Sequence, residues 1–137
     1  MADKVRKVSY CYVTVPSRAG QAARILGELR KEGVSLLAYS GFPSQGRAQL
    51  DLVAESVTPI RKIATKNGWQ VSPPRHGFLI QGKDKKGAVY KQLQKLADER
   101  INVTAADAVS AGKGRYGMLL WVKPKDYARA AKTLKAK

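Results

Sequence analysis

The sequence is poor in the residues on which catalysis and metal binding usually depend. Its 137 residues include one cysteine and one histidine, Cys11 and His76, which excludes an internal disulfide and a cluster of thiolate metal ligands. Cys11 falls inside an apolar run, where a cysteine is usually a small buried hydrophobe. Paired carboxylates, a P-loop and a Gly-x-Ser-x-Gly elbow are missing as well. We therefore expect neither an enzyme nor a metal or other cofactor.

Long apolar runs are missing too. No run approaches the roughly 20 residues that span a bilayer. The first residues, Met1-Ala2-Asp3-Lys4, show no apolar segment ahead of a small-residue cleavage site, so no secretion signal is indicated. With 44% apolar residues, the composition is that of a globular protein. The sequence predicts a cytoplasmic protein with no membrane partner.

Acidic residues are scarce. The chain has ten Asp and Glu residues and 26 Lys and Arg residues, which gives a formal net charge of +16 at pH 7. Such a charge favours anionic partners through long-range attraction, and nucleic acid is the obvious class. Lysines such as Lys91 and Lys95 also lie at helical spacing beside apolar stripes, as on an ordinary solvated helix face. The charge therefore leaves nucleic-acid binding and simple solubility both open.

The sequence does contain one order of elements that is used twice. The first half predicts strand, helix, strand, strand, helix and strand at residues 8–15, 21–32, 34–42, 48–54, 58–67 and 69–72. The second half predicts a strand at 78–81, a helix marked by Val89, Leu93, Leu96 and Ala97, a hairpin of 101–110 and 115–122, and a terminal helix marked by Tyr127, Ala131 and Leu134. Alignment of the halves places Gly20 opposite Gly87, Val34 opposite Ile101, and Gly46-Arg47 opposite Gly114-Arg115. This self-similarity indicates an internal duplication.

The repeated order predicts an α+β fold built from two ferredoxin-like βαββαβ units. Each unit would be an antiparallel sheet with both helices on one face, because crossover connections are right-handed. We expect a first domain at residues 1–72, a linker at 73–77, and a second domain at 78–137 whose last strand is short or missing. Alternation along the strands places Tyr10, Tyr12 and Tyr116 on open sheet faces and Trp121 on the helix-facing side.

Two short loops are the main candidates for a binding site. Ser17 to Gly20 and Asp84 to Gly87 each lead from a predicted strand into a predicted helix. A glycine there lets a ligand approach the backbone, and the free N–H groups of the helix N-terminus favour an anionic group such as a carboxylate. Basic side chains in both loops would add positive charge. Ordinary polar turns have a similar composition, so the loops alone leave binding open.

On these motifs the sequence resembles the ACT domain family over nearly its whole length, as two copies. The family's first loop commonly reads Asp-Arg-Pro-Gly, which Arg18 and Gly20 match in the first copy and Asp84 and Gly87 in the second. The family also tends to carry Gly-Ile-Asn-Ile before its second strand, where this chain has Gly33-Val34-Ser35-Leu36 and Arg100-Ile101-Asn102-Val103. The resemblance implies a stand-alone regulatory protein that binds a free amino acid or similar small carboxylate at the interface between its units.

The loops and the resemblance together indicate one set of ligand-binding residues, at the first loops and at the start of the second strands. They are Ser17, Arg18, Ala19, Gly20, Gln21, Val34, Ser35, Asp84, Lys85, Gly87, Ile101 and Asn102. Because the two loops differ in sequence, we expect unequal sites. Arg18-Ala19-Gly20 facing Asn102 is the first site to examine.

Two other functions remain open at this point. A basic RNA- or DNA-binding module of ferredoxin-like fold is one, because residues 115–121 partly imitate the aromatic third strand of RNA-recognition modules. The imitation is incomplete, since Tyr116 is followed by Met118 and not by an aromatic residue at the next alternate position. A structural dimerisation module without a ligand is the other, because tyrosines on an open sheet face suit an interface. We expect a homodimer in either regulatory or structural use.

Overall fold

The computed structural model describes residues 3–137, which form two compact units. The N-unit is Ser9–Arg75, and the C-unit joins Met1–Val8 to His76–Lys137. Strand β1 (Lys4–Pro16) contributes residues to both units. The strand order is β2-β3-β1-β4-β6-β5, and the ladders within β1–β3, β2–β3, β4–β6 and β5–β6 are antiparallel. The predicted α+β fold of ferredoxin-like character is confirmed.

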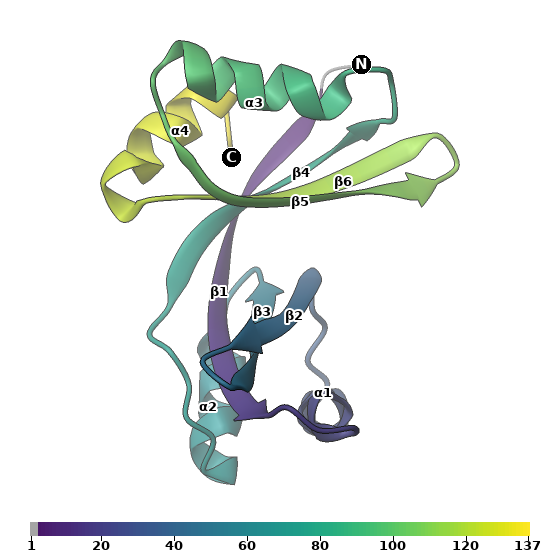
Figure 1. Cartoon of the computed structure of the whole chain (residues 1–137), viewed down its shortest axis with the longest axis vertical. Coiled ribbons are helices and arrows are strands. Elements are labelled where there is room, and N and C mark those ends of the chain that lie inside the picture. The colour runs from purple at the N-terminus through teal and green to yellow at the C-terminus, as the bar shows by residue number, and fades with distance from the viewer. Residues whose placement is uncertain (1–2) are drawn as a thin grey trace. The chain divides into compact units, whose positions relative to one another are not determined.

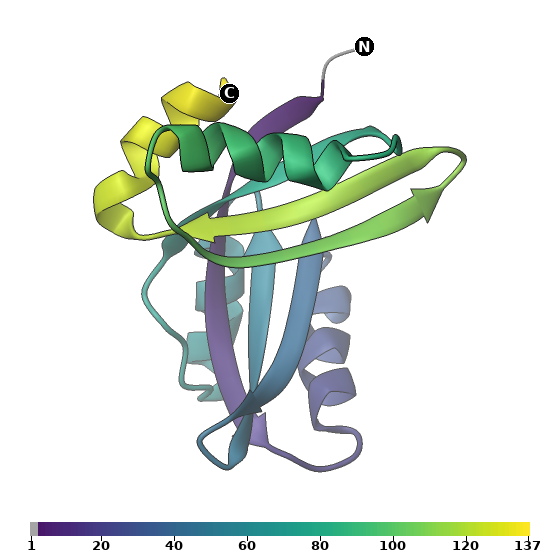
Figure 2. The same ribbon diagram turned by 45° about the horizontal axis from the view of Figure 1, so that its top comes forward.

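The N-unit packs two helices against one face of its sheet. Its elements after β1 are α1 (Gln21–Lys31), β2 (Ala38–Ser44), β3 (Arg47–Ala54) and α2 (Thr58–Asn67). Cys11 pairs with Leu52 and is fully buried in the core beneath the helices, as the sequence predicts. Tyr12 pairs with Asp51 and therefore points to the opposite face, as predicted for the open side. Figure 2 shows both helices on the same side of β1 and β3.

The C-unit has the same plan. It contains β4 (Arg75–Lys83), α3 (Ala88–Asp98), β5 (Val103–Gly112), β6 (Arg115–Val122), a short 3-10 helix (Pro124–Asp126) and α4 (Tyr127–Leu134). Figure 1 shows α3 and α4 covering one face of the sheet of β4, β6 and β5. Phe78, Ile80, Leu96, Leu120 and Leu134 are the centre of the core between them.

The strand that the second half lacks in the sequence comes from the start of the chain. The residues of β1 up to Val8 belong to the C-unit, where β1 neighbours β4. The backbone N–H of Lys7 donates to the carbonyl of Lys137 at 3.0 Å, and that of Lys137 donates to the carbonyl of Val5 at 3.1 Å. Val5 is 6% exposed and packs in the C-unit core. The expected first domain, residues 1–72, thus differs from the N-unit at its start.

The expected linker at residues 73–77 is also shorter in the structure. Pro73 and Pro74 lie outside regular structure, but Arg75, His76 and Gly77 are already part of β4. The His76 ring lies 5.6 Å from the ring of Tyr127, which stacks on Phe78 at 4.6 Å. Histidine 76, expected to be a linker residue, is therefore a strand residue beside the C-unit core.

The two halves repeat the same backbone hydrogen bonds at the loops that precede α1 and α3. In the first loop, the N–H of Gln21 donates to the Arg18 carbonyl, and the N–H of Arg24 donates to the Gly20 carbonyl. In the second loop, the N–H of Ala88 donates to the Lys85 carbonyl, and the N–H of Lys91 donates to the Gly87 carbonyl. Gly20 and Gly87 have φ of 85° and 76°, in the left-handed region that glycine adopts without strain. Val34 N–H donates to Leu29 as Ile101 N–H does to Leu96. The predicted alignment of Gly20 with Gly87 and of Val34 with Ile101 is confirmed locally.

The predicted orientation of β6 is wrong. Tyr116, Met118 and Leu120 face α3 and α4 and belong to the core, so Tyr116 is not on the open face. Trp121, expected among the helix-facing residues, lies on the opposite side of the strand although it is only 7% exposed. Both faces of β6 are buried, so the strand offers no polar side from which the direction could be inferred.

The contribution of β1 to the C-unit can be measured with Val5→Ala. Removing the buried methyl groups should lower the free energy of unfolding by about 2 kcal/mol, through lost burial and the cavity left behind. Urea denaturation checks this, with Lys4→Ala as the control because Lys4 is exposed on the same strand. Equal effects of the two substitutions would contradict the placement of Val5 in the core.

Candidate functional site

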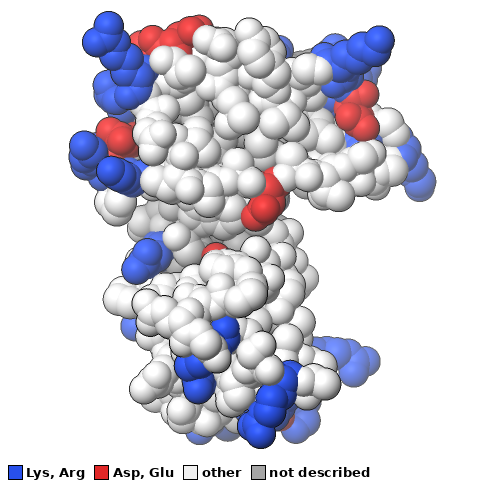
Figure 3. All heavy atoms as spheres, viewed as in Figure 1, with Lys and Arg blue, Asp and Glu red and all other residues white. Residues whose placement is uncertain are grey.

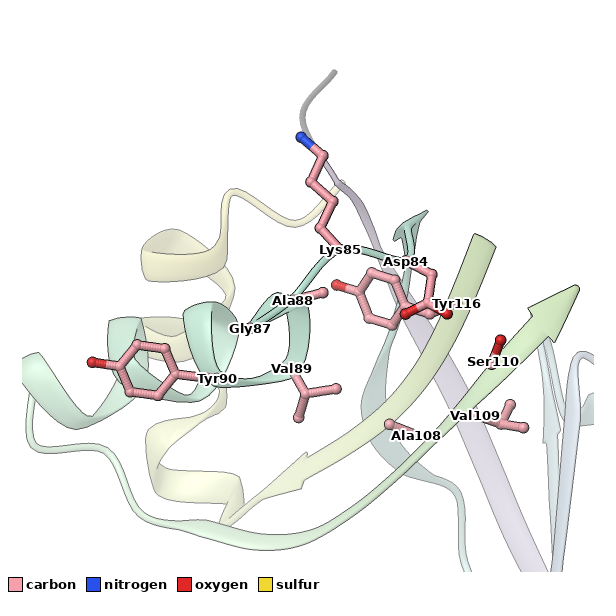
Figure 4. Close-up of a pocket in the computed structure, with 10 residues that line it drawn as sticks. All are labelled: Asp84, Lys85, Gly87, Ala88, Val89, Tyr90, Ala108, Val109, Ser110 and Tyr116. Atoms are coloured by element: carbon pink, nitrogen blue, oxygen red, sulfur yellow. The ribbon is translucent and has the colours of Figure 1, made fainter. Parts of the chain in front are cut away.

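A pocket of about 250 Å³ opens beside the N-terminus of α3, at the loop that the sequence singles out in the second half. We call it the α3 pocket. Side chains from α3, β5 and β6 surround it in Figure 4. Its lining residues are Asp84, Lys85, Gly87, Ala88, Val89, Tyr90, Ala108, Val109, Ser110 and Tyr116.

The loop end of the α3 pocket is suited to a negative charge. Gly87 is the N-cap of α3, no side chain caps this helix end, and no acidic residue stands in its first turn. The N–H groups of the first turn and the helix dipole therefore favour an anion there. Lys85 also lines the pocket, although Figure 4 shows its ammonium group pointing away from the other lining side chains. The loop is fixed to the β5–β6 turn, because the Asp84 N–H donates to the Gly114 carbonyl at 2.8 Å.

A buried polar cluster lies behind the pocket. The Tyr116 hydroxyl donates to Oδ2 of Asp3 at 2.6 Å, and Nε2 of Gln92 donates to the same oxygen at 2.6 Å. Tyr116 is 4% and Gln92 1% exposed. Gly82 makes room for this carboxylate, since a Cβ at that position would collide with the Asp3 side chain. Oε1 of Gln92 is buried with no hydrogen-bond partner among the described residues.

The N-unit contains no such cluster at the matching positions. The repeated hydrogen bonds place Val15, Ile25 and Ala48 where the C-unit has Gly82, Gln92 and Tyr116. Val15 and Ile25 are buried core residues, so an all-apolar solution also satisfies the fold. The polar cluster is therefore not required to build the unit, and a buried polar group that the fold does not need calls for another explanation.

Burial raises the pKa of the Tyr116 phenol strongly, and the adjacent Asp3 carboxylate raises it further. Both effects disfavour the phenolate, because a negative charge there would be poorly solvated and would repel the carboxylate. The hydroxyl keeps its proton throughout the physiological range and directs it to Asp3.

The matching loop of the N-unit borders a second pocket, of about 310 Å³, which we call the α1 pocket. Its lining residues are Val15, Pro16, Ser17, Arg18, Ala19, Gln21, Ala22 and Ala48. Arg18 is its one charged lining side chain, and no carboxylate lines it. The side-chain carbonyl of Gln21 already accepts a bond from Arg24 at 3.1 Å. This pocket therefore offers positive charge alone.

The structure places the predicted ligand-binding residues in two groups. Ser17, Arg18, Ala19 and Gln21 line the α1 pocket with Gly20 as the N-cap of α1, and Asp84, Lys85 and Gly87 line the α3 pocket. Val34, Ser35, Ile101 and Asn102 line neither. Ile101 is buried in the C-unit core, Val34 packs against the N-unit core, and Ser35 and Asn102 are exposed. Their role as ligand contacts stays a prediction.

Sequence reasoning missed Asp3, Gln92, Ser110 and the inward direction of Tyr116. One signal was available for Gln92, which lies three residues after Val89 and four before Leu96 and so interrupts the apolar stripe of α3. Nothing in the sequence linked Asp3 to it, because the two residues meet only after β1 has joined the C-unit.

The aromatic residues behind the RNA-recognition interpretation are not free to stack on bases. Tyr116 and Trp121 are 4% and 7% exposed, and Phe78 is fully buried. Arg75 lies over the ring of Tyr12 at 5.4 Å. In Figure 3, the Lys and Arg side chains on the visible face are scattered and do not merge into one continuous patch.

Residues 3–137 contain neither a candidate metal cluster nor a helix suited to crossing a membrane. No group of three or more His, Cys, Asp and Glu side chains there could hold a metal ion. No helix in that range combines the length and apolar character that crossing a bilayer requires.

Comparison with solved structures supports the same fold. Protein BT0572 from Bacteroides thetaiotaomicron superposes with a TM-score of 0.76 at 17% identity, over 97% of this chain and 88% of that one. The ligand-free regulatory subunit of aspartate kinase from Thermus thermophilus gives 0.65 at 14% identity, over 98% and 93%. The aspartokinase alpha and beta subunits give 0.64 at 15% identity, over 96% and 94%. The fold is ACT-like.

Comparison by sequence finds no relative of this chain. No protein-family model matches the chain, and no curated protein matches it. The identities with the solved structures are low, so the likeness concerns the fold.

The buried phenol gives a pH dependence that can be checked. Below pH 10, the ordinary tyrosine pKa, the phenol is protonated in the folded and the unfolded chain. As the pH rises above 10 the unfolded chain loses this proton first, so the free energy of unfolding falls. Tyr116→Phe should remove that part of the fall, as measured by urea denaturation between pH 8 and 11. Tyr90→Phe is the control, because Tyr90 is 67% exposed. Parallel pH profiles of wild type and Tyr116→Phe would contradict the raised pKa.

Proposed function

We propose that this chain is a regulatory, non-catalytic protein that binds a free amino acid in the α3 pocket. The observation that carries the proposal is that one pocket offers groups for both charges of a zwitterion. The uncapped helix start suits a carboxylate, Lys85 in the adjoining loop adds positive charge nearby, and Asp84 suits an ammonium group. The α1 pocket, which has no carboxylate, suits a simple anion.

The Tyr116 hydroxyl strengthens the ammonium end. A phenol has one proton, and Tyr116 donates it to Asp3. The lone pairs that remain on this oxygen can only accept a hydrogen bond. Tyr116 also lines the α3 pocket, so a ligand that reaches the oxygen must bring a donor. An α-amino acid has such a donor beside its carboxylate, whereas a keto acid does not.

The solved neighbours support a regulatory role. Two are regulatory subunits of aspartate kinase, and they share the fold over nearly the whole of both chains. Their low identity means that the ligand of this chain has to be argued from its own residues. We propose that it acts as a stand-alone protein with two ACT-like domains and controls a partner through ligand binding.

A binding assay with and without the ammonium group tests the amino-acid proposal. Calorimetric titration with the twenty standard amino acids should give saturable binding for at least one, and the N-acetyl form of that amino acid should bind much more weakly. Asp84→Asn should reduce the affinity about tenfold or more, since a charged hydrogen bond contributes about 1.5–3 kcal/mol. Asp107→Asn is the matched control, because Asp107 lies on β5 and does not line the pocket.

Asp3 variants test the hydroxyl argument in the same assay. Asp3→Asn keeps a carbonyl oxygen that can accept the Tyr116 proton, so discrimination against the N-acetyl form should persist. Asp3→Ala frees the hydroxyl to donate, so discrimination should shrink. The absence of saturable binding by any of the twenty amino acids would sink the proposed function.

We also propose that the chain forms a homodimer through the outer edge of β5. This strand ends the strand order, its residues from Thr104 to Gly112 are exposed, and Val109 is 66% exposed. An exposed edge strand is a template for pairing with another strand, and a lysine on it weakens such pairing. Sedimentation velocity should show a dimer that Val109→Lys dissociates, whereas Ala23→Lys on the exposed side of α1 should leave it intact. A monomer at all concentrations would contradict this.

A further inference from the structure

A third pocket lies on the side of α2 in the N-unit, away from the loop that borders the α1 pocket. Its volume is about 360 Å³, and Thr58, Arg61, Lys62, Thr65 and Pro74 line it. The four α2 residues stand at positions i, i+3, i+4 and i+7, which places them on one face of the helix. We call it the α2 pocket.

Arg61 distinguishes this pocket from an ordinary basic helix face. Its Nε is buried and has no hydrogen-bond partner, the one arginine nitrogen within residues 3–137 in that condition. A buried donor without an acceptor is destabilising, and more so when the group is charged. An acceptor that binds from the pocket would relieve this.

The pocket has an excess of positive charge that the described chain does not neutralise. Its lining contains two cationic side chains and no carboxylate. None of the ion pairs in the described part of the chain involves Arg61 or Lys62, whereas Lys66 on the same helix pairs with Glu32 at 3.7 Å. Neighbouring cations repel each other, so a bound anion would stabilise both.

The repeat shows that the fold does not need an arginine here. After α2, the N–H of Trp69 donates to the Ala64 carbonyl, and after α4 the N–H of Ala136 donates to the Ala131 carbonyl. These equivalent bonds align α2 with α4. By this alignment Ala128 stands where the N-unit has Arg61. Alanine therefore serves the same helix position in the second copy, and the buried, unpaired Nε of the partly buried Arg61 needs a reason other than packing.

We propose that the α2 pocket binds the phosphate group of a small phosphorylated molecule. The planar guanidinium of Arg61 suits two oxygens of a tetrahedral oxyanion, and the ammonium group of Lys62 suits a third. The pocket is larger than a phosphate ion, which leaves space for an organic part. This site is independent of the amino-acid site, because it lies on another helix and its lining has no carboxylate for an ammonium group.

Inorganic phosphate is the probe for the test. Titration into the ¹⁵N-labelled full chain at constant ionic strength should shift the amide signals of α2 saturably, and chloride should not. Arg61→Ala should weaken binding about tenfold or more, and Arg61→Lys nearly as much, because lysine keeps the charge but lacks the Nε–H and the fork. Lys66→Ala is the control, since it removes a cation of α2 that does not line the pocket.

The outcomes separate the alternatives. Circular dichroism is the check that Arg61→Ala is folded, as Ala128 leads us to expect, and Arg61→Lys repeats the test with less change of volume. A phosphate effect that Arg61→Ala and Lys66→Ala reduce equally would overturn the site and indicate general charge attraction. Response to a single-stranded oligonucleotide but not to phosphate would overturn it in favour of a polymer. Failure of the amino-acid proposal would appear in the signals of α3, so the two results are distinguishable.

Discussion

Residues near opposite ends of the sequence meet in the C-unit, where the backbone of Lys137 bonds to Lys7 and to Val5. The apolar faces of α3 and α4 must be covered, and β4, β6 and β5 alone leave out the strand position beside β4. The start of β1 fills that position and inserts Val5 into the core. The same strand brings Asp3 to Gln92 and Tyr116. Completion of the C-unit sheet and the polarity of its pocket thus depend on one strand.

The order of the elements was predictable because helix and strand periods and glycine positions are local properties. Gly20 and Gly87 mark equivalent helix starts, and the structure gives them equivalent hydrogen bonds. The origin of the missing strand was not predictable in this way. No local pattern records that the first residues of β1 pair with the second half of the chain, since that pairing depends on contacts distant in sequence.

The prediction of which face of β6 points toward the helices failed for a different physical reason. Alternation divides a strand into two faces, but it identifies the inner face only when the other face is polar. Tyr116 and Trp121 lie on opposite faces and both are buried. The candidate loops, by contrast, were found from sequence because their glycines and charges are adjacent. The polar groups behind the α3 pocket come from β1, α3 and β6, so only the interrupted stripe at Gln92 hinted at them.

Comparison of the two halves separates what the fold requires from what it tolerates. Equivalent backbone bonds show that α1 and α3, and α2 and α4, occupy equivalent places in their units. Where the side chains agree, as at the glycine N-caps, the backbone conformation explains the agreement. Where one copy buries at least one polar atom of a side chain and the other has an apolar residue, stability does not explain the difference. Tyr116 against Ala48 and Arg61 against Ala128 are such pairs, and each polar member lines a pocket. The copies have therefore kept one scaffold while placing different chemistry on it, with opposite charges side by side in the C-unit and unbalanced positive charge in the N-unit.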